Sequence, residues 1–331
     1  MKWFITGGCG FIGSALIRHL LADDADHRII AFDNLSTGTR NDLAGVSEFS
    51  ELQNPEHAFN GGHRLQLFVG DFLDPAQTAD VARNADVVVH LAANTGVGPS
   101  VEDPINDCYT NVIGTLNVLE AARHGNTKRF LLASSGAPIG EVDPPIHEEL
   151  APHPVSPYGA SKLAGEGYCS AYYGTFGLET VALRFGNVYG PGSLHKGSVV
   201  AKFIKQAQQG EPLEVYGDGK QTRDFIFIDD LVRAIELGAT TPGIGGETFQ
   251  IATNHETTVS ELAEVLIQVL QENGIDDAKL IYGEPRVGDV MRNYSDTSKA
   301  REKLGWQSEF ELKSGLGSTV RYFLSNSNSL R

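Results

Sequence analysis

Two residues of this chain have the types and the spacing of an acid–base pair. Tyr158 and Lys162 lie four residues apart in a stretch that predicts a helix, so their side chains share one helical face. A free tyrosine has a pKa of about 10 and is a poor base near neutral pH. A neighbouring ammonium favours the phenolate, so a lysine at this spacing suits proton transfer by the tyrosine. Taken alone the pair is weak evidence, because a solvated helix face often carries both residue types.

Two serines stand where a substrate could reach them. Ser134 and Ser135 directly follow an apolar run at residues 128–133, which predicts a buried strand. Ligands of open parallel sheets bind beyond the carboxyl ends of the strands. The two hydroxyls are therefore candidates for substrate contacts, and a proline-rich loop at residues 137–157 separates them from the helix of the tyrosine.

The elements that must position these side chains begin with a glycine-rich turn. Residues 3–5 predict a buried strand, residues 11–21 predict a helix, and Gly7, Gly10 and Gly13 mark the turn between them. Such a turn lets backbone N–H groups and the positive end of the helix approach a pyrophosphate. The third glycine also lets the helix pack close to the strand. The arrangement is the fingerprint of a dinucleotide-binding fold.

Acidic residues support that interpretation. Asp33 ends a second apolar run, where a carboxylate accepts both hydroxyls of an adenosine ribose and repels a 2′-phosphate. NAD is therefore expected rather than NADP, and the nearby cation Arg40 is the basis of the alternative. Asp71 follows another predicted strand and could accept from the adenine amine or belong to a helix cap. A bound nicotinamide ring, being positive, would further favour the phenolate of Tyr158.

Strand and helix patterns alternate through the first half of the chain. Residues 85–91 and 179–185 predict buried strands, and residues 104–124 predict a long helix that begins at a proline. Repeated β-α-β units predict an α/β fold with a doubly wound parallel sheet. His90 lies within a strand and is interpreted as structural, and residues 44–63 predict an irregular excursion.

Bulk composition excludes several classes of protein. The chain has 331 residues and 41% hydrophobic residues, enough for one large α/β domain and a smaller one. A net charge of −16 argues against a nucleic-acid or membrane-surface partner. Three scattered cysteines without metal-ligand spacing indicate a reducing cytoplasm and no metal site. We expect neither a membrane span nor an export signal, because glycines interrupt the apolar N-terminus.

Several short segments together carry a family resemblance. They are Thr6-Gly-Gly-Cys-Gly-Phe-Ile-Gly13, Asp33-Asn-Leu-Ser36, His90-Leu-Ala-Ala93, Asn111-Val-Ile-Gly-Thr115, Ser134-Ser135 and Tyr158-x-x-x-Lys162. This set resembles the extended short-chain dehydrogenase/reductase family, and within it the NAD-dependent nucleotide-sugar epimerases and dehydratases of the UDP-glucose 4-epimerase type. The resemblance implies a Rossmann-type doubly wound sheet with a smaller C-terminal α/β substrate domain. The implied NAD-binding domain consists of residues 1–185 and about 224–253. The implied nucleotide-sugar-binding domain consists of about residues 186–223 and 254–331.

The resemblance also implies roles for individual residues. Ser135 would hydrogen-bond the sugar, Tyr158 would be the acid/base, and Lys162 would also hold the nicotinamide ribose. The implied NAD contacts are Gly7, Gly10, Phe11, Ile12, Gly13, Asp33, Asn34, Ser36, Thr37, Gly38, Asp71, Phe72, Leu91, Ala92, Ala93, Thr95, Thr110, Ser134, Tyr158, Lys162 and Phe185.

A second set of implied contacts concerns the nucleotide sugar. Asn187 would contact the diphosphate and Tyr216 would lie beside the base, while Arg223 and Arg286 would each pair with a phosphate. Two guanidinium groups suit a diphosphate because each binds phosphate bidentately. The full set of implied substrate contacts is Ser135, Tyr158, Asn187, Val199, Leu213, Tyr216, Arg223, Arg286 and Asp289.

The segment after Ser135 departs from some members of the family. Dehydratases carry Asp-Glu there and decarboxylases a Glu, whereas this chain has Gly136 and Ala137. We therefore expect epimerisation of a nucleotide-diphosphate hexose at C4, foremost a UDP-hexose, through a transient 4-keto intermediate. The alternatives are another keto-intermediate enzyme (decarboxylase, 4,6-dehydratase or reductase) and a non-catalytic NAD-binding sensor. The following Pro138-Ile139-Gly140 also departs from the usual pattern, so the hexose itself stays open.

A homodimer is the expected assembly. By resemblance, the helices at 104–124 and 157–174 pack with their copies as a four-helix bundle. Ile113, Leu116 and Tyr172 are candidates for the buried seam, with a place in the intrachain core as the alternative for each.

Overall fold

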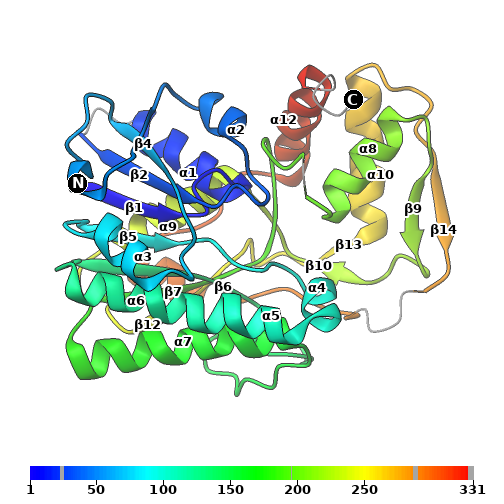
Figure 1. Cartoon of the computed structure of the whole chain (residues 1–331). Helices are drawn as coiled ribbons and strands as arrows, with labels where there is room; N and C mark the ends of the chain where they lie inside the picture. The colour runs from blue at the N-terminus through cyan, green and yellow to red at the C-terminus, as the bar shows by residue number, and fades with distance from the viewer. Residues whose placement is uncertain (23–25, 195, 286–289, 327–331) are drawn as a thin grey trace.

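One large parallel sheet forms the centre of the computed structural model, which describes residues 1–22, 26–194, 196–285 and 290–326 (Figure 1). Its eight strands lie in the order β12-β7-β6-β5-β1-β2-β4-β3, and every neighbouring pair is parallel. The strands are β1 (Lys2–Thr6), β2 (Arg28–Asp33), β3 (Ser50–Glu51), β4 (Leu65–Val69), β5 (Val87–His90), β6 (Arg129–Ser135), β7 (Thr180–Phe185) and β12 (Glu247–Ile251). The expected doubly wound α/β fold is confirmed.

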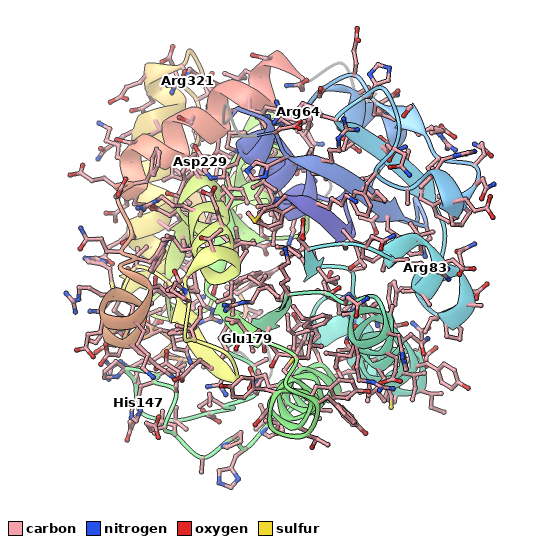
Figure 2. All side chains as sticks on the ribbon, turned by 90° about the vertical axis from the view of Figure 1, so that its left-hand side faces the viewer. Arg64, Arg83, His147, Glu179, Asp229 and Arg321 are labelled. Atoms are coloured by element: carbon pink, nitrogen blue, oxygen red, sulfur yellow. The ribbon has the colours of Figure 1, made fainter. Side chains whose placement is uncertain are left out.

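Alternation along the strands divides the core into two layers. On β1, Trp3 and Ile5 face one layer, which α1 (Phe11–Ala22) and α9 (Ile228–Thr240) cover. Phe4 faces the other layer, which α3 (Pro75–Ala82), α6 (Gly114–His124) and α7 (Pro157–Phe176) cover. Figure 2 shows these helices on opposite sides of the sheet, with charged side chains such as Arg83 and Arg321 at the outer surface. Burial on both faces explains the continuous apolar runs of the strands.

The predicted long helix at 104–124 is present but changes its winding midway. It consists of α5 (Pro104–Cys108), a π-helical turn η2 (Tyr109–Ile113) and α6, and α4 (Val97–Glu102) precedes it. Single π-turns of this kind occur often at functional sites. The irregular stretch at 44–63 contains the end of α2 (Arg40–Ala44), the edge strand β3 and the short 3-10 turn η1 (Pro55–His57).

Most of the remaining elements gather at the carboxyl side of the sheet (Figure 1), whereas α11 packs against β12 and α9. Three two-stranded pairs lie there, β9 with β14, β10 with β13 and β8 with β11. The bounds are β8 (Asn187–Tyr189), α8 (Val199–Gln208), β9 (Leu213–Tyr216), β10 (Thr222–Arg223), β11 (Phe225–Phe227), β13 (Thr257–Thr258), α10 (Val259–Glu272), β14 (Leu280–Gly283), α11 (Ser298–Leu304) and α12 (Leu312–Ser325). Thr258 caps α10 through a capping box with Glu261. The division into two domains stays our interpretation.

None of the helices described in the structure is long and apolar enough to cross a membrane.

Candidate active site

The glycine-rich turn after β1 adopts a backbone that side chains would obstruct. Gly7 has φ +69°, and a Cβ there would lie 3.0 Å from the backbone nitrogen of Ala92. A Cβ on Gly13 would lie only 2.2 Å from the carbonyl oxygen of Gly7. The third glycine therefore lets the helix pack onto the turn itself, and the first turn of α1 faces the space beyond β1.

A cavity of about 630 Å³ lies at this turn, along the carboxyl ends of the central strands. Seventeen of the residues expected to contact NAD line it. They are Gly7, Gly10, Phe11, Ile12, Gly13, Asp33, Asn34, Ser36, Thr37, Gly38, Asp71, Phe72, Leu91, Ala92, Ala93, Thr95 and Thr110. Leu73, Asn94, Asn106 and Lys196 also line the cavity and were not expected from the sequence. Its size and glycine-lined wall fit a dinucleotide.

Asp33 is held in place by two backbone donors. Its Oδ2 accepts from the N–H of Cys9 at 2.9 Å, and its Oδ1 accepts from the N–H of Leu35 at 2.8 Å. Each oxygen keeps a lone pair for a ribose hydroxyl, although burial raises the pKa of this carboxyl. Arg40, the cation behind the NADP alternative, donates to Glu51 at 2.6 Å and is not among the residues that line the cavity.

The structure bears on two further interpretations from the sequence, those of Asp71 and His90. Asp71 lines the cavity, and the residue that caps α3 is Asp74 instead. His90 is buried, with its two ring nitrogens 2.8 Å from the hydroxyl of Thr6 and 3.1 Å from that of Thr115. Burial lowers the pKa of this imidazole to about 3, so it stays neutral, which confirms the structural interpretation.

The acid–base pair and one serine meet beyond the end of β6. The side chain of Ser135 lies close enough to the phenol of Tyr158, in the first turn of α7, to favour its ionised form and so lower its pKa. The ammonium of Lys162 lies 5.8 Å from the centre of the tyrosine ring and donates to the carbonyl of Ala133 at 2.9 Å. The structure thus brings the side chains of Ser135, Tyr158 and Lys162 together at the end of β6.

Burial dominates the pKa values of this pair. It raises the pKa of Tyr158 to about 12, against the opposite effect of the hydrogen bond from Ser135. Burial also lowers the pKa of Lys162 to about 8. The lysine alone therefore does not lower the pKa of the tyrosine as its spacing led us to expect, because desolvation of the phenolate is the larger effect.

Ser134 faces away from its neighbour Ser135. Its hydroxyl donates to Glu166 at 2.5 Å, and Glu166 accepts two hydrogen bonds from Arg184, at 2.7 and 2.8 Å. All three side chains are buried. The side chain of Ser134 is thus engaged in a buried ion-pair network, and Ser134 does not line either cavity. Phe185, at the end of β7, is half-buried and does not line the large cavity.

A smaller cavity of about 160 Å³ adjoins the first at Lys196, which lines both. Asn187 and Val199, two of the expected substrate contacts, line it together with Ser198 at the N-terminus of α8. The hydroxyl of Ser198 is buried without a hydrogen-bond partner among the described residues. Burial lowers the pKa of Lys196, whose ammonium lies 5.5 Å from the ring centre of Phe11. An ammonium beside the N-terminus of a helix makes this corner compatible with an anion.

Other expected substrate contacts lie on strands β9 and β10. The hydroxyl of Tyr216 accepts from Lys202 at 2.9 Å, and Arg223 donates to the carbonyl oxygens of Thr222 and Val290, both at 2.7 Å. Leu213 is fully buried in the core, so its side chain cannot contact a substrate as the resemblance implied. Arg286 and Asp289 lie outside the described residues.

Comparison with known proteins identifies the class to which this fold and this cavity belong. A family model described as the NAD dependent epimerase/dehydratase family matches residues 3–252, so the chain belongs to that family. NAD is accordingly its cofactor, and the glycine cradle and the cavity behind it fit that group.

Individual relatives span the full chain. It is 34% identical to a UDP-glucose 4-epimerase of Mycolicibacterium smegmatis, over 99% of this chain and 100% of that protein. The crystal structure of UDP-glucose 4-epimerase with UDP-glucose from Thermotoga maritima superposes with a TM-score of 0.86 at 33% identity, covering 100% of both chains.

A dehydratase is similarly close. The crystal structure of a dTDP-glucose 4,6-dehydratase from Streptomyces venezuelae with NAD bound has a TM-score of 0.86 at 31% identity, covering 99% of this chain and 98% of that one. The family therefore establishes an NAD-dependent nucleotide-sugar enzyme, and the reaction must be argued from the site.

Proposed function

We propose that this enzyme inverts C4 of a nucleotide-diphosphate hexose, foremost a UDP-hexose, through a transient 4-keto intermediate. The observation that carries the proposal is the placement of Ser135, the last residue of β6, where its hydroxyl acts on the phenol of Tyr158, with Lys162 one helical turn further on α7. This is the edge of the sheet where the NAD cavity lies.

In this proposal each residue handles a proton at a stated atom. NAD, when bound, supplies reversible hydride transfer at the sugar carbon. The phenolate oxygen of Tyr158 takes the proton of the C4 hydroxyl, and the hydroxyl of Ser135 holds that oxygen in line. The 4-keto intermediate then rotates to present its opposite face. The phenol of Tyr158 returns the proton to the C4 oxygen. The ammonium of Lys162 stabilises the phenolate form and orients the ribose beside it.

The residues after Ser135 favour epimerisation over dehydration. Elimination of a C6 hydroxyl needs an acid and a base beside the sugar, and positions 136 and 137 are Gly and Ala. A Cβ at Gly136 would meet nothing within 4 Å, so the position has space for a side chain, and the sequence places none there. Asp107 is the described carboxylate whose charge raises the pKa of Tyr158, and it is buried on α5.

We further propose that the small cavity holds the substrate diphosphate. Asn187, Lys196 and Ser198 offer an amide, an ammonium and an unpartnered hydroxyl there, beside the N-terminus of α8. Charged and dipolar donors of these kinds suit an anion. The base would then extend toward Tyr216 and the second phosphate toward Arg223.

Incubation of the purified protein with a panel of nucleotide sugars, followed by chromatography and mass spectrometry, tests the reaction. The panel contains UDP-glucose, UDP-galactose, UDP-N-acetylglucosamine, UDP-glucuronic acid and dTDP-glucose. Conversion to a C4 epimer of equal mass is expected for a UDP-sugar, whereas loss of water or of carbon dioxide would replace the proposal by a dehydratase or a decarboxylase. No conversion of any sugar by NAD-loaded protein would favour a non-catalytic role.

The Tyr158→Phe variant provides the matched control. It removes the transferable proton but keeps the ring, so the fold and NAD retention should survive. Loss of a general acid/base lowers the rate by on the order of 10²–10⁴-fold. Turnover within about threefold of the wild type, well outside that range, would show that another residue is the base.

We also propose that the protein is a homodimer through one helical face. Apolar side chains of α4, α5 and η2 are exposed, including Val101, Ile105 (76% exposed) and Tyr109 (59% exposed). Monomeric surfaces rarely carry contiguous apolar patches of this kind. Of the expected seam residues, Ile113 is exposed and Leu116 is partly buried against the core. Tyr172 is instead buried within the chain, where its hydroxyl donates to Glu120 at 2.6 Å, so its place in the seam was wrong.

A further inference from the structure

Asp107 on α5 is a buried carboxylate that forms no direct ion pair within the described residues. The residue is 1% exposed, and its Oδ1 accepts one hydrogen bond from Asn111 at 2.9 Å. Its Oδ2 is buried without any hydrogen-bond partner among the described residues, and none of the ion pairs formed within those residues includes Asp107. Burying a carboxylate in this way is unfavourable unless the charge serves a purpose.

Hydrogen bonds connect Asp107 to the catalytic pair. The π-turn η2 presents the amide of Asn111 both to Asp107 and to the hydroxyl of Ser161, at 3.2 Å. Ser161 precedes Lys162 on α7, and its hydroxyl donates to the backbone carbonyl of Tyr158 at 3.0 Å. The carboxylate is thus held at a set position relative to the turn of α7 that carries both catalytic side chains.

The other charged groups around Lys162 are already matched. Glu166, on the same helix, binds Arg184 through two hydrogen bonds and Ser134 through a third. His90, from β5, is neutral because burial lowers its pKa to about 3. Asp107 is therefore the unpaired negative charge that the described part of this site directs at the lysine and the tyrosine.

The hydrogen bond alone does not explain an acid at this position. An asparagine would accept the same bond from Asn111 through its carbonyl oxygen and would avoid burying a charge. What the aspartate adds over an asparagine is its negative charge, close to two groups that must hold defined protonation states.

We propose that Asp107 is a positioning residue that acts by charge: it keeps Lys162 an ammonium and Tyr158 a phenol near neutral pH, so that the proton is released only to the bound substrate and cofactor. The inference rests on the acid–base role of Tyr158 in the proposed function. Its direction agrees with the electrostatics, because the charge of Asp107 raises the pKa of both Tyr158 and Lys162.

The pH profile of Asp107→Asn tests the proposal. In the NAD-loaded enzyme the positive nicotinamide ring lowers the pKa of Tyr158, so in kcat/KM the acid limb reports loss of the tyrosine proton and the alkaline limb reports loss of the lysine proton. Removing the negative charge lowers both pKa values, so both limbs should move toward lower pH by on the order of one unit. A residue with a merely structural role would reduce the rate at every pH and leave both limbs in place, and that result would overturn the proposal.

Asp103→Asn is the matched control. Asp103 is the exposed N-cap of the same helix, so its variant removes an equal charge from solvent and should leave both limbs in place. If Asp107→Asn does not fold, Asp107→Ser removes the same charge with less volume. Failure of both variants to fold would assign Asp107 a structural role and overturn the proposal.

A titration that needs no turnover separates this proposal from the proposed function. The ultraviolet absorbance of tyrosinate is followed with pH in NAD-loaded protein, with and without Tyr158→Phe, so that the difference isolates one phenol. The pKa of that phenol should be lower in the Asp107→Asn background than in the wild type. An unchanged value would overturn the proposal, whereas a lowered value in a protein that epimerises nothing would sustain it and count against the proposed function alone.

Discussion

At the scale of single residues, burial and neighbouring charges have opposite effects on the pKa of Lys162. Lys162 is 6% exposed, and burial lowers the pKa of its ammonium to about 8, even though Asp107 and Glu166 act in the opposite direction. The same enclosure raises the pKa of Tyr158. Without a further positive charge the proton stays on the phenol, which suits an enzyme that must not ionise its base before the reaction begins.

The lowered pKa of Lys162 predicts opposite trends in activity and stability with pH. Activity should decline as the pH rises past about 8, because the ammonium is lost. Stability should rise over the window from about 8 to the ordinary lysine pKa near 10.5, because there the unfolded chain holds a proton that the folded chain has released.

Urea unfolding of the wild type and of Lys162→Met across that window measures the second trend. The free energy of unfolding of the wild type should rise by on the order of 3 kcal/mol relative to that of the variant between the two pH limits. Parallel curves for the two proteins would show that Lys162 titrates normally.

Residues differ in how well the sequence revealed them. Tyr158, Lys162 and Ser135 could be predicted because their chemistry needs a helical spacing and a strand end, both of which are local in sequence. Lys196 and Asp107 could not, because each acts across elements distant in the chain: Lys196 joins two cavities, and Asp107 reaches α7 through Asn111. The burial of the Leu213 side chain could not be predicted either, because a motif match does not say which way a strand residue faces.

At the scale of elements, the contact between the glycine turn and α1 gives a stringent prediction. Gly13→Ala would place a Cβ 2.2 Å from the carbonyl oxygen of Gly7, which is backbone and cannot move away freely. We expect loss of NAD retention together with lower thermal stability, measured by cofactor content and calorimetry.

Gly174→Ala in α7 is the matched control, since a Cβ there meets nothing within 4 Å. It should retain NAD and raise stability by about 0.5–1 kcal/mol, because alanine favours a helix interior over glycine. Equal NAD retention by both alanine variants would contradict the role assigned to the turn.

The buried ion pair that ties α7 to β7 gives another prediction. Arg184→Met leaves the carboxylate of Glu166 buried with only Ser134 as a side-chain donor, and removal of one partner of a buried pair costs about 3–5 kcal/mol. In the double variant Arg184→Met/Glu166→Leu, most of that loss should be recovered, because two apolar side chains replace two charges. Urea unfolding measures both, and a double variant as unstable as the single one would show that the pair is needed for packing geometry.

Elements were predictable wherever the pattern was periodic or continuously apolar. The strands of the sheet core and helix α1 follow their apolar patterns closely, and α7 lies where the stretch around Tyr158 and Lys162 predicted a helix. The π-turn was not predictable, because a single widened turn leaves the apolar period almost unchanged. The short strand β3 was missed for a different reason, since two residues are too few to show any period.

At the scale of the whole molecule, buried aspartates anchor the C-terminal segments to the sheet. Asp224 accepts hydrogen bonds from the backbone of Thr253, Asn254 and Ser295. Asp230, at the start of α9, accepts from the backbone of Glu309 and Phe310. These bonds join segments that lie far apart in the chain, which is why spacing along the sequence did not reveal them.

The exposed apolar face of α4, α5 and η2 carries the last prediction, which concerns assembly. Light scattering at micromolar concentration should give twice the 35.7 kDa mass of the chain. The double variant Ile105→Asp/Tyr109→Asp places two charges on this face and should be monomeric with an unchanged circular dichroism spectrum, because both side chains project into solvent within one chain. Ile281→Asp, on the exposed strand β14, is the control and should leave the dimer intact. A wild type of monomer mass would contradict the proposed dimer, and a double variant that stays dimeric would move the interface to another surface.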